Sequence, residues 1–191
     1  MTRLRLAELA VIVAVLVPTA ALSCQSSDGE RRPSSATRLP EPDDALSEEL
    51  MIALAQAKNF IHKAKVHVGD GNVPDAIASV HQILAIPFPA GAPEGEDVRL
   101  DARAFLAKLL AGQGKLDEAM QVVEDGIAEA RRHSFFLANL WTVKGELYEA
   151  RAKQLAGTPA AAEANRDAIR AFDQSITINA ALQERLFKER P

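Results

Sequence analysis

Cysteine, aromatic residues and excess positive charge are all scarce in this 191-residue chain. The single cysteine, Cys24, excludes an intrachain disulfide framework and a zinc site built from several cysteines. The formal net charge of -4 provides no broadly basic surface, so we expect no nucleic-acid partner. Aromatic residues make up only 5% of the chain, whereas alanine, the strongest helix former, occurs 35 times. The composition therefore predicts an all-α protein.

The chain also lacks an apolar run long enough to span a membrane. The longest run, residues 9–17, would reach about 14 Å as a helix, against about 30 Å of bilayer hydrocarbon. It follows two basic residues, Arg3 and Arg5, and has the length of the apolar part of a secretory signal peptide. We therefore expect the first residues to direct export.

Small residues precede the only cysteine in the segment Thr-Ala-Ala-Leu-Ser-Cys24. This segment resembles the lipobox of bacterial lipoproteins. The resemblance implies that residues 1–23 are a signal peptide, that Cys24 is acylated, and that the acyl chains anchor the protein to the membrane. Gln25 after the cysteine then implies the outer membrane, with the protein facing the periplasm. Ordinary signal-peptide cleavage before Cys24 is the alternative.

Residues 24–44 are rich in serine and proline and contain nothing that would form a core, so we interpret them as a flexible tether. From residue 45 onward, apolar residues recur at helical spacings of three and four. Glycine and proline interrupt this pattern at residues 69–71, 87–95, 112–114 and 157–159. The interruptions predict about six helices in a domain that spans residues 45–191.

An internal repeat is visible within these helices. Trp141, Lys144, Gly145 and Tyr148, followed by Ala168 and Phe172, resemble the tetratricopeptide repeat (TPR) pattern. The resemblance implies an α-solenoid of about three degenerate TPR-like hairpins, at about residues 57–90, 100–133 and 138–182. A C-terminal capping helix is expected at about residues 180–190, where apolar residues form a narrow stripe. The alternative is a helical hairpin bundle without repeat character.

Small residues at matching positions would let paired helices approach closely, and aromatic residues complete the third copy. The expected repeat core therefore consists of Ala64, Ala76, Ala107, Ala119, Trp141, Gly145, Tyr148, Ala168 and Phe172.

Catalytic signatures are not found in the sequence. The segment Gly112-Gln-Gly114-Lys115 lacks the hydroxyl residue and the earlier glycine of a phosphate-binding loop. The spacing of His62 and His67 is wrong for one helix face, and the pair Glu146 and Glu149 is more typical of a solvated helix face than of an acid–base couple. We therefore expect no enzyme activity, no metal site and no cofactor.

In TPR arrays the first helix of each hairpin lines a groove that holds a partner segment. The resemblance implies a groove of Lys58, Ile61, Lys65, Asp101, Lys108, Asn139, Thr142, Glu146 and Glu149. These charges would run from basic in the first repeat to acidic in the third, so the acidic part of a bound segment would lie toward the first repeat.

These observations together predict a non-catalytic, membrane-anchored scaffold or assembly factor that binds another envelope protein or a peptide segment. The loop at residues 87–95 is a candidate contact for a homo-oligomer. The alternative function is a periplasmic ligand-binding or enzyme-accessory protein that uses an aromatic pocket between Trp141, Tyr148 and Phe172.

Overall fold

The computed structural model describes residues 47–189, and within this range the regular secondary structure is entirely helical. The predicted signal peptide, Cys24 and the whole of the tether lie outside the described residues. Six helices follow one another: α1 (Glu48–Gly69), α2 (Val73–Leu84), α3 (Pro93–Gly112), α4 (Leu116–Glu129), α5 (Phe135–Gln154) and α6 (Pro159–Lys188). The all-α class predicted from the composition is confirmed.

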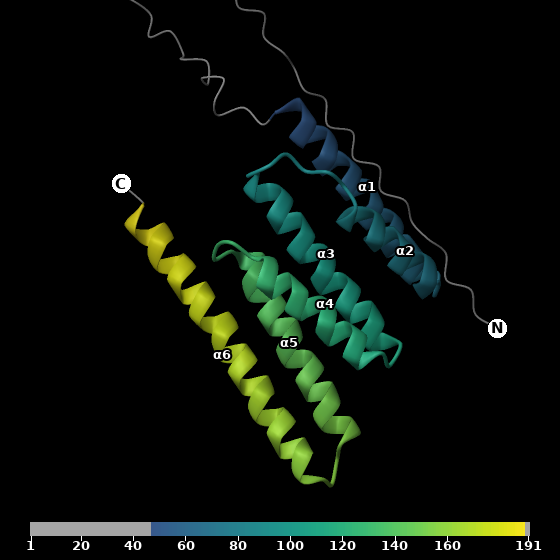
Figure 1. Ribbon diagram of the computed structural model, residues 1–191, viewed down its shortest axis with the longest axis vertical. Coiled ribbons are helices and arrows are strands. Elements are labelled where there is room, and N and C mark those ends of the chain that lie inside the picture. Colours follow the sequence, from purple (N-terminus) through teal and green to yellow (C-terminus); the bar gives the residue numbers. More distant parts are fainter. Residues whose placement is uncertain (1–46, 190–191) are drawn as a thin grey trace, which may run out of the picture. The chain divides into compact units, whose positions relative to one another are not determined.

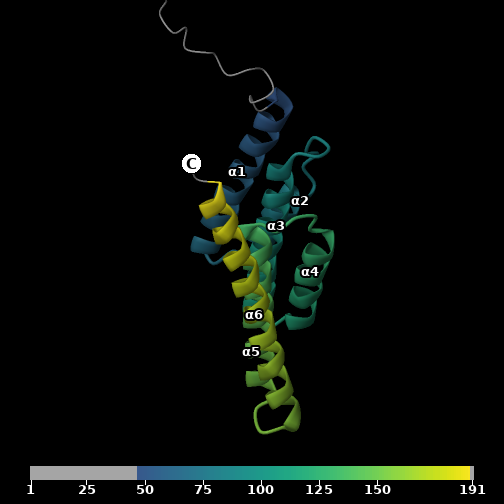
Figure 2. The same ribbon diagram turned by 90° about the vertical axis from the view of Figure 1, so that its left-hand side faces the viewer.

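The helices form three consecutive antiparallel hairpins, α1–α2, α3–α4 and α5–α6 (Figure 1). Each helix packs against the next one in the sequence, and the first helices of successive hairpins also pack together, α1 on α3 and α3 on α5. Figure 2 shows the same succession from the side, with α4 lying apart from α6. The fold of the described residues is therefore built mainly from neighbour-to-neighbour contacts.

Helix ends are set by local residues. The Ser47, Asn72 and Ser134 side chains accept hydrogen bonds from the backbone N–H groups of Leu50, Asp75 and Leu137, which caps α1, α2 and α5. Four of the connections contain a glycine with a positive φ of 74–84°, which permits a tight turn there. These glycines are Gly71, Gly91, Gly114 and Gly157.

The core is made of small and branched residues rather than aromatic ones. Its largest fully buried side chains are Leu106, Leu140, Val80, Val123 and Val143. Alanines fill many of the remaining buried positions, which lets the helix axes approach closely. The low aromatic content of the chain is therefore compatible with a continuous core.

The α4–α5 connection is fixed to the start of α3. Arg132 forms an ion pair with Asp97 at 2.5 Å and donates to the carbonyl oxygen of Pro93 at 3.1 Å. The backbone N–H of Arg131 donates to the Glu96 carboxylate at 3.1 Å. These contacts join segments that are about 35 residues apart and set where the third hairpin begins.

Two expected boundaries differ from the observed ones. The expectation that the second copy begins near residue 100 placed its start too late, because Pro93 occupies the first turn of α3 and starts the helix there. The separate capping helix expected at about residues 180–190 is also wrong, because residues up to Lys188 continue α6 without a break. No proline or glycine occurs within α6 after Pro159, so nothing in the sequence ends that helix earlier.

The C-terminal part of α6 extends past the start of α5. Thr142 lies opposite Ser175, with 2.9 Å between the two hydroxyl oxygens. Seven residues back from Thr142 is Phe135, the first residue of α5, and seven residues on from Ser175 is Leu182. The last turns of α6 therefore continue beyond the partner helix, as the yellow end in Figure 1 shows.

Candidate functional site

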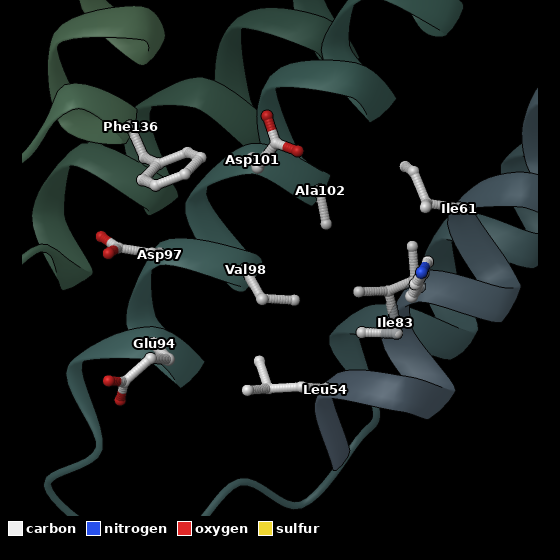
Figure 3. A pocket seen from close by; sticks show the side chains of 11 residues that line it. Leu54, Ile61, Ile83, Glu94, Asp97, Val98, Asp101, Ala102 and Phe136 are labelled. Carbon is white, nitrogen blue, oxygen red and sulfur yellow. The ribbon is translucent and has the colours of Figure 1, made fainter. Parts of the chain in front are cut away.

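A cavity of about 390 Å³ lies between α1 and α3 and is open to solvent. We call it the α1–α3 cavity. Figure 3 shows Val98 and Ala102 of α3 pointing toward Leu54 and Ile61 of α1, with Ile83 of α2 beside them. Its remaining lining residues are Ala57, Lys58, Glu94, Asp97, Asp101 and Phe136.

Small residues leave this space open. Ala57 and Ala102 are buried at 5% and 2% exposure, so α1 and α3 meet there through methyl groups. Around them Leu54, Ile61 and Val98 are only half-buried, because no further helix covers them. The result is an apolar surface that a partner side chain could cover favourably.

Three carboxylates follow α3 along one side of the cavity: Glu94, Asp97 and Asp101. Figure 3 shows all three turned away from the apolar centre. Asp97 is engaged with Arg132, although its buried Oδ1 atom has no hydrogen-bond partner among the described residues. Glu94 and Asp101 form no ion pair within 4.0 Å in residues 47–189, so their charges remain available.

The electrostatic environment of Asp101 is mixed. Although the residue is exposed by its surface area, the surrounding protein partly desolvates the carboxyl group and raises its pKa above 3.8. The positive charge of Lys65, on α1, lowers the pKa but does not cancel the effect of desolvation. Lys65 of α1 therefore lies close enough to α3 for its charge to act on Asp101.

The structure brings part of the sequence-predicted groove together. Lys58, Ile61 and Asp101 line the α1–α3 cavity, and Lys65 lies close enough to act on Asp101. Further along, Lys108 of α3 and Glu146 of α5 form an ion pair at 3.1 Å.

This ion pair joins a basic and an acidic residue of the expected groove. Lys108 and Glu146 were expected in the second and third repeats, and each neutralises the other. The unpaired charges instead differ across the groove: lysines on α1 face carboxylates on α3. The spacing along each helix was insufficient to predict this, because it does not fix which side chains of neighbouring helices meet.

The groove residues of α5 have different surroundings. Asn139 is half-buried and Glu149 is exposed. The Thr142 hydroxyl lies 2.9 Å from the Ser175 hydroxyl and also donates to the carbonyl oxygen of Ala138, so it belongs to the contact between α5 and α6.

A second cavity, of about 450 Å³, lies beside Trp141 and Tyr148 between α5 and α6. Phe172 does not line it, so the expected three-aromatic pocket is wrong in this respect. The Phe172 ring packs on Gly145 instead, where an added Cβ atom would lie 2.5 Å from it. The Lys144 ammonium lies 5.4 Å and 6.0 Å from the Trp141 and Tyr148 ring centroids and pairs with Glu124 at 3.0 Å.

The residues of the predicted repeat core are placed in two groups. Its small members are all buried, namely Ala64, Ala76, Ala107, Ala119, Gly145 and Ala168. The aromatic members Trp141, Tyr148 and Phe172 are half-buried at the edges of the α5–α6 hairpin.

Several residues of the α1–α3 cavity were not predicted from the sequence, above all Glu94, Val98 and Phe136. Glu94 and Val98 precede the expected start of the second repeat. Pro93 was the available signal, because proline is favoured in the first turn of a helix. Phe136 reaches the cavity from α5, and no local pattern indicates that long-range contact.

Within residues 47–189 no group of three or more His, Cys, Asp and Glu side chains is placed to hold a metal ion. None of the helices of this part of the chain is both long and apolar enough to cross a bilayer. No protein-family model matches the chain, and no curated protein or solved structure shows significant similarity to it.

Proposed function

We propose that this protein is a non-catalytic scaffold or assembly factor of the bacterial cell envelope, anchored to the membrane through an acylated Cys24. Its helical domain is an α-solenoid of three TPR-like hairpins that holds a segment of another envelope protein. The observation that carries the proposal is the solvent-open, apolar α1–α3 cavity, lined by Lys58, Ile61 and Asp101.

Two further features support the solenoid. The first helices of the hairpins pack on one another, α1 on α3 and α3 on α5, as stacked repeats require. Small residues are buried at corresponding positions of successive hairpins, such as Ala64, Ala107 and Gly145 on the first helices. Both features follow from hairpins that stack by burying one face against the next.

Ligand binding at Trp141 is the less favoured alternative. The space over the two aromatic rings is already approached by the chain's own cation, Lys144, which Glu124 holds in place. A cationic ligand would have to displace this side chain and leave Glu124 unpaired.

The scaffold proposal is tested by affinity capture of the tagged full chain from detergent-solubilised membranes. Ile61→Lys places a charge in the apolar lining and should abolish recovery of the partner, while circular dichroism checks the helical fold. Ile169→Lys is the matched control, because Ile169 is 60% exposed on α6 and does not line the cavity. Equal recovery with both variants would contradict binding at the cavity, and no reproducible partner would contradict the scaffold itself.

Anchoring is tested separately by Cys24→Ser. The variant should move from the membrane fraction to the soluble fraction because it has no thiol to acylate. Ser23→Ala is the control and should remain in the membrane fraction. Membrane retention of Cys24→Ser would contradict the lipid anchor.

A further inference from the structure

Charged residues form two rows of opposite sign at the α1–α3 cavity: Lys58, Glu94 and Asp101 line it, and Lys65 follows Lys58 on α1. Lys58 and Lys65 are seven residues apart on α1, and Glu94 and Asp101 are seven residues apart on α3. Seven residues correspond to about 10.5 Å along a helix axis. The two rows therefore have the same length, two helical turns.

The rows lie side by side because the two helices run in the same direction. Lys58 and Glu94 line the same cavity, and the charge of Lys65 acts on Asp101. Figure 1 shows α1 and α3 starting at the same end of the hairpins. The apolar side chains of Leu54, Ile61 and Val98 lie between the rows.

None of the four charges forms an ion pair within 4.0 Å among the described residues. In contrast, nearby charges outside the rows form ion pairs, such as Asp97 with Arg132 and Lys108 with Glu146. An apolar strip bordered by a basic row and an acidic row is complementary to an amphipathic helix whose two edges carry opposite charges.

We infer that the α1–α3 cavity receives an apolar side chain of an amphipathic helix of another protein, with a basic edge over Glu94 and Asp101 and an acidic edge over Lys58 and Lys65. This inference rests on the proposed scaffold function and specifies its partner. The charge rows fix the direction in which the partner helix lies, because turning it end for end exchanges its two edges.

The test uses the full chain and a synthetic 18-residue helical peptide with leucines on one face, lysines on one edge and glutamates on the other. Binding is measured by fluorescence anisotropy at low salt. Lys58→Glu with Lys65→Glu makes both rows acidic and should weaken binding about tenfold, since two attractive charge pairs become repulsive. Lys63→Glu is the matched control, because Lys63 is exposed on α1 but does not line the cavity, and should leave the affinity unchanged.

The fourfold variant Lys58→Glu, Lys65→Glu, Glu94→Lys and Asp101→Lys exchanges the two rows. It should restore the affinity to within about threefold of the parent chain, and the peptide should bind in the opposite direction. A nitroxide on the peptide N-terminus reports direction through the broadening of methyl NMR signals of Leu54 and Val68, which lie about four turns apart along α1. The broadened signal should change from one of these residues to the other.

Restored affinity without reversal, or equal affinity of the parent and the Lys58→Glu, Lys65→Glu variant, would overturn the inference. No detectable binding up to about 1 mM peptide would overturn it as well, because a dissociation constant of about 1 mM corresponds to a binding free energy of only about 4 kcal/mol. Dimerisation of the parent chain that the same charge reversal abolishes would assign the cavity to a second copy instead. In each of these cases, a partner that the parent chain captures and the Ile61→Lys variant does not would leave the scaffold proposal standing. Failure of this inference and failure of the scaffold proposal are therefore distinguishable.

Discussion

At the residue scale, the contact between Gly145 and Phe172 limits how close α5 and α6 lie. A Cβ atom at residue 145 would approach the Phe172 ring to 2.5 Å. Gly145→Ala should therefore destabilise the domain by about 1 kcal/mol, because overpacking outweighs the gain in helix propensity. Urea unfolding of the variant measures the change.

Gly112→Ala is the control for this substitution. Gly112 ends α3, and a Cβ atom there would meet nothing within 4 Å. The variant should be neutral or stabilised by up to about 1 kcal/mol. In a Phe172→Leu background the cost of Gly145→Ala should shrink, and an unchanged cost would contradict the assigned contact.

The raised pKa of Asp101 predicts a pH dependence of stability. Because burial disfavours the ionised carboxylate in the folded state, the free energy of unfolding should fall as pH rises from 3.8 through the folded-state pKa. Asp101→Asn should therefore have a higher Tm than the parent at pH 7, and this advantage should disappear below pH 3.8. Thermal scans across that pH range measure the difference.

Lys65→Met tests whether the Lys65 charge acts on the pKa of Asp101. Removing the charge that lowers the pKa of Asp101 should raise that pKa further, which carboxyl NMR titration measures directly. A lowered or unchanged pKa would contradict the electrostatic interaction between the two residues.

At the scale of single elements, the cap of α5 is the most buried of the three side-chain caps. Ser134 is 4% exposed and accepts a hydrogen bond from the Leu137 N–H at 3.1 Å. Ser134→Ala should destabilise the domain by about 1–2 kcal/mol, because a buried N–H group loses its partner. Denaturant unfolding is the measurement.

Thr158 is the control position at the start of α6. Its side chain donates to the carbonyl oxygen of Leu155 and does not cap α6, and the residue is exposed. Thr158→Ala should therefore cost less than Ser134→Ala, at most about 1 kcal/mol. An equal or greater loss at Thr158 would contradict the importance of the buried cap.

The existence of the helices was predictable because their signals are local. Helical spacing of apolar residues and interruptions such as Gly112 and Gly157 are visible within one segment. The side-chain partners were not predictable in the same way. Thr142 meets Ser175 and Lys108 meets Glu146 because neighbouring helices adopt a particular rotation, which no single helix encodes.

At the scale of the whole described domain, neighbour-to-neighbour packing predicts unequal local stability. The α1–α2 hairpin is held to the rest through α3. Ala64→Leu, at a fully buried position of α1, should reduce hydrogen-exchange protection in α1 and α2 while α5 and α6 keep theirs. Mass spectrometry of exchanged peptides resolves the helices.

Ala55→Leu is the control on the same helix, because Ala55 is exposed. It should leave protection unchanged throughout. A uniform loss of protection in Ala64→Leu would contradict the stepwise cooperativity expected of stacked hairpins and would favour a single bundle.

At this scale, only part of the α1–α3 cavity could be predicted from the sequence. Ile61 and Asp101 could be assigned to one face from helical periodicity, but Phe136 joins them from a third hairpin. Whether Phe136 reaches the cavity depends on how far α5 is shifted relative to α3. That displacement depends on contacts such as Asp97 with Arg132, between residues 35 positions apart.

The bond network from Arg131 and Arg132 to Glu96, Asp97 and the carbonyl oxygen of Pro93 has a consequence for protein engineering. A chimera in which the third hairpin is replaced from the first residue of α5 onward would keep Arg131 and Arg132, and with them all of these contacts. A chimera in which the chain is replaced from the end of α4 onward would lose Arg132 and leave Asp97 without its ion-pair partner. The angle at which the grafted hairpin packs would then change. The exchangeable unit of this domain therefore begins after Arg132, close to the start of α5, rather than at the end of α4.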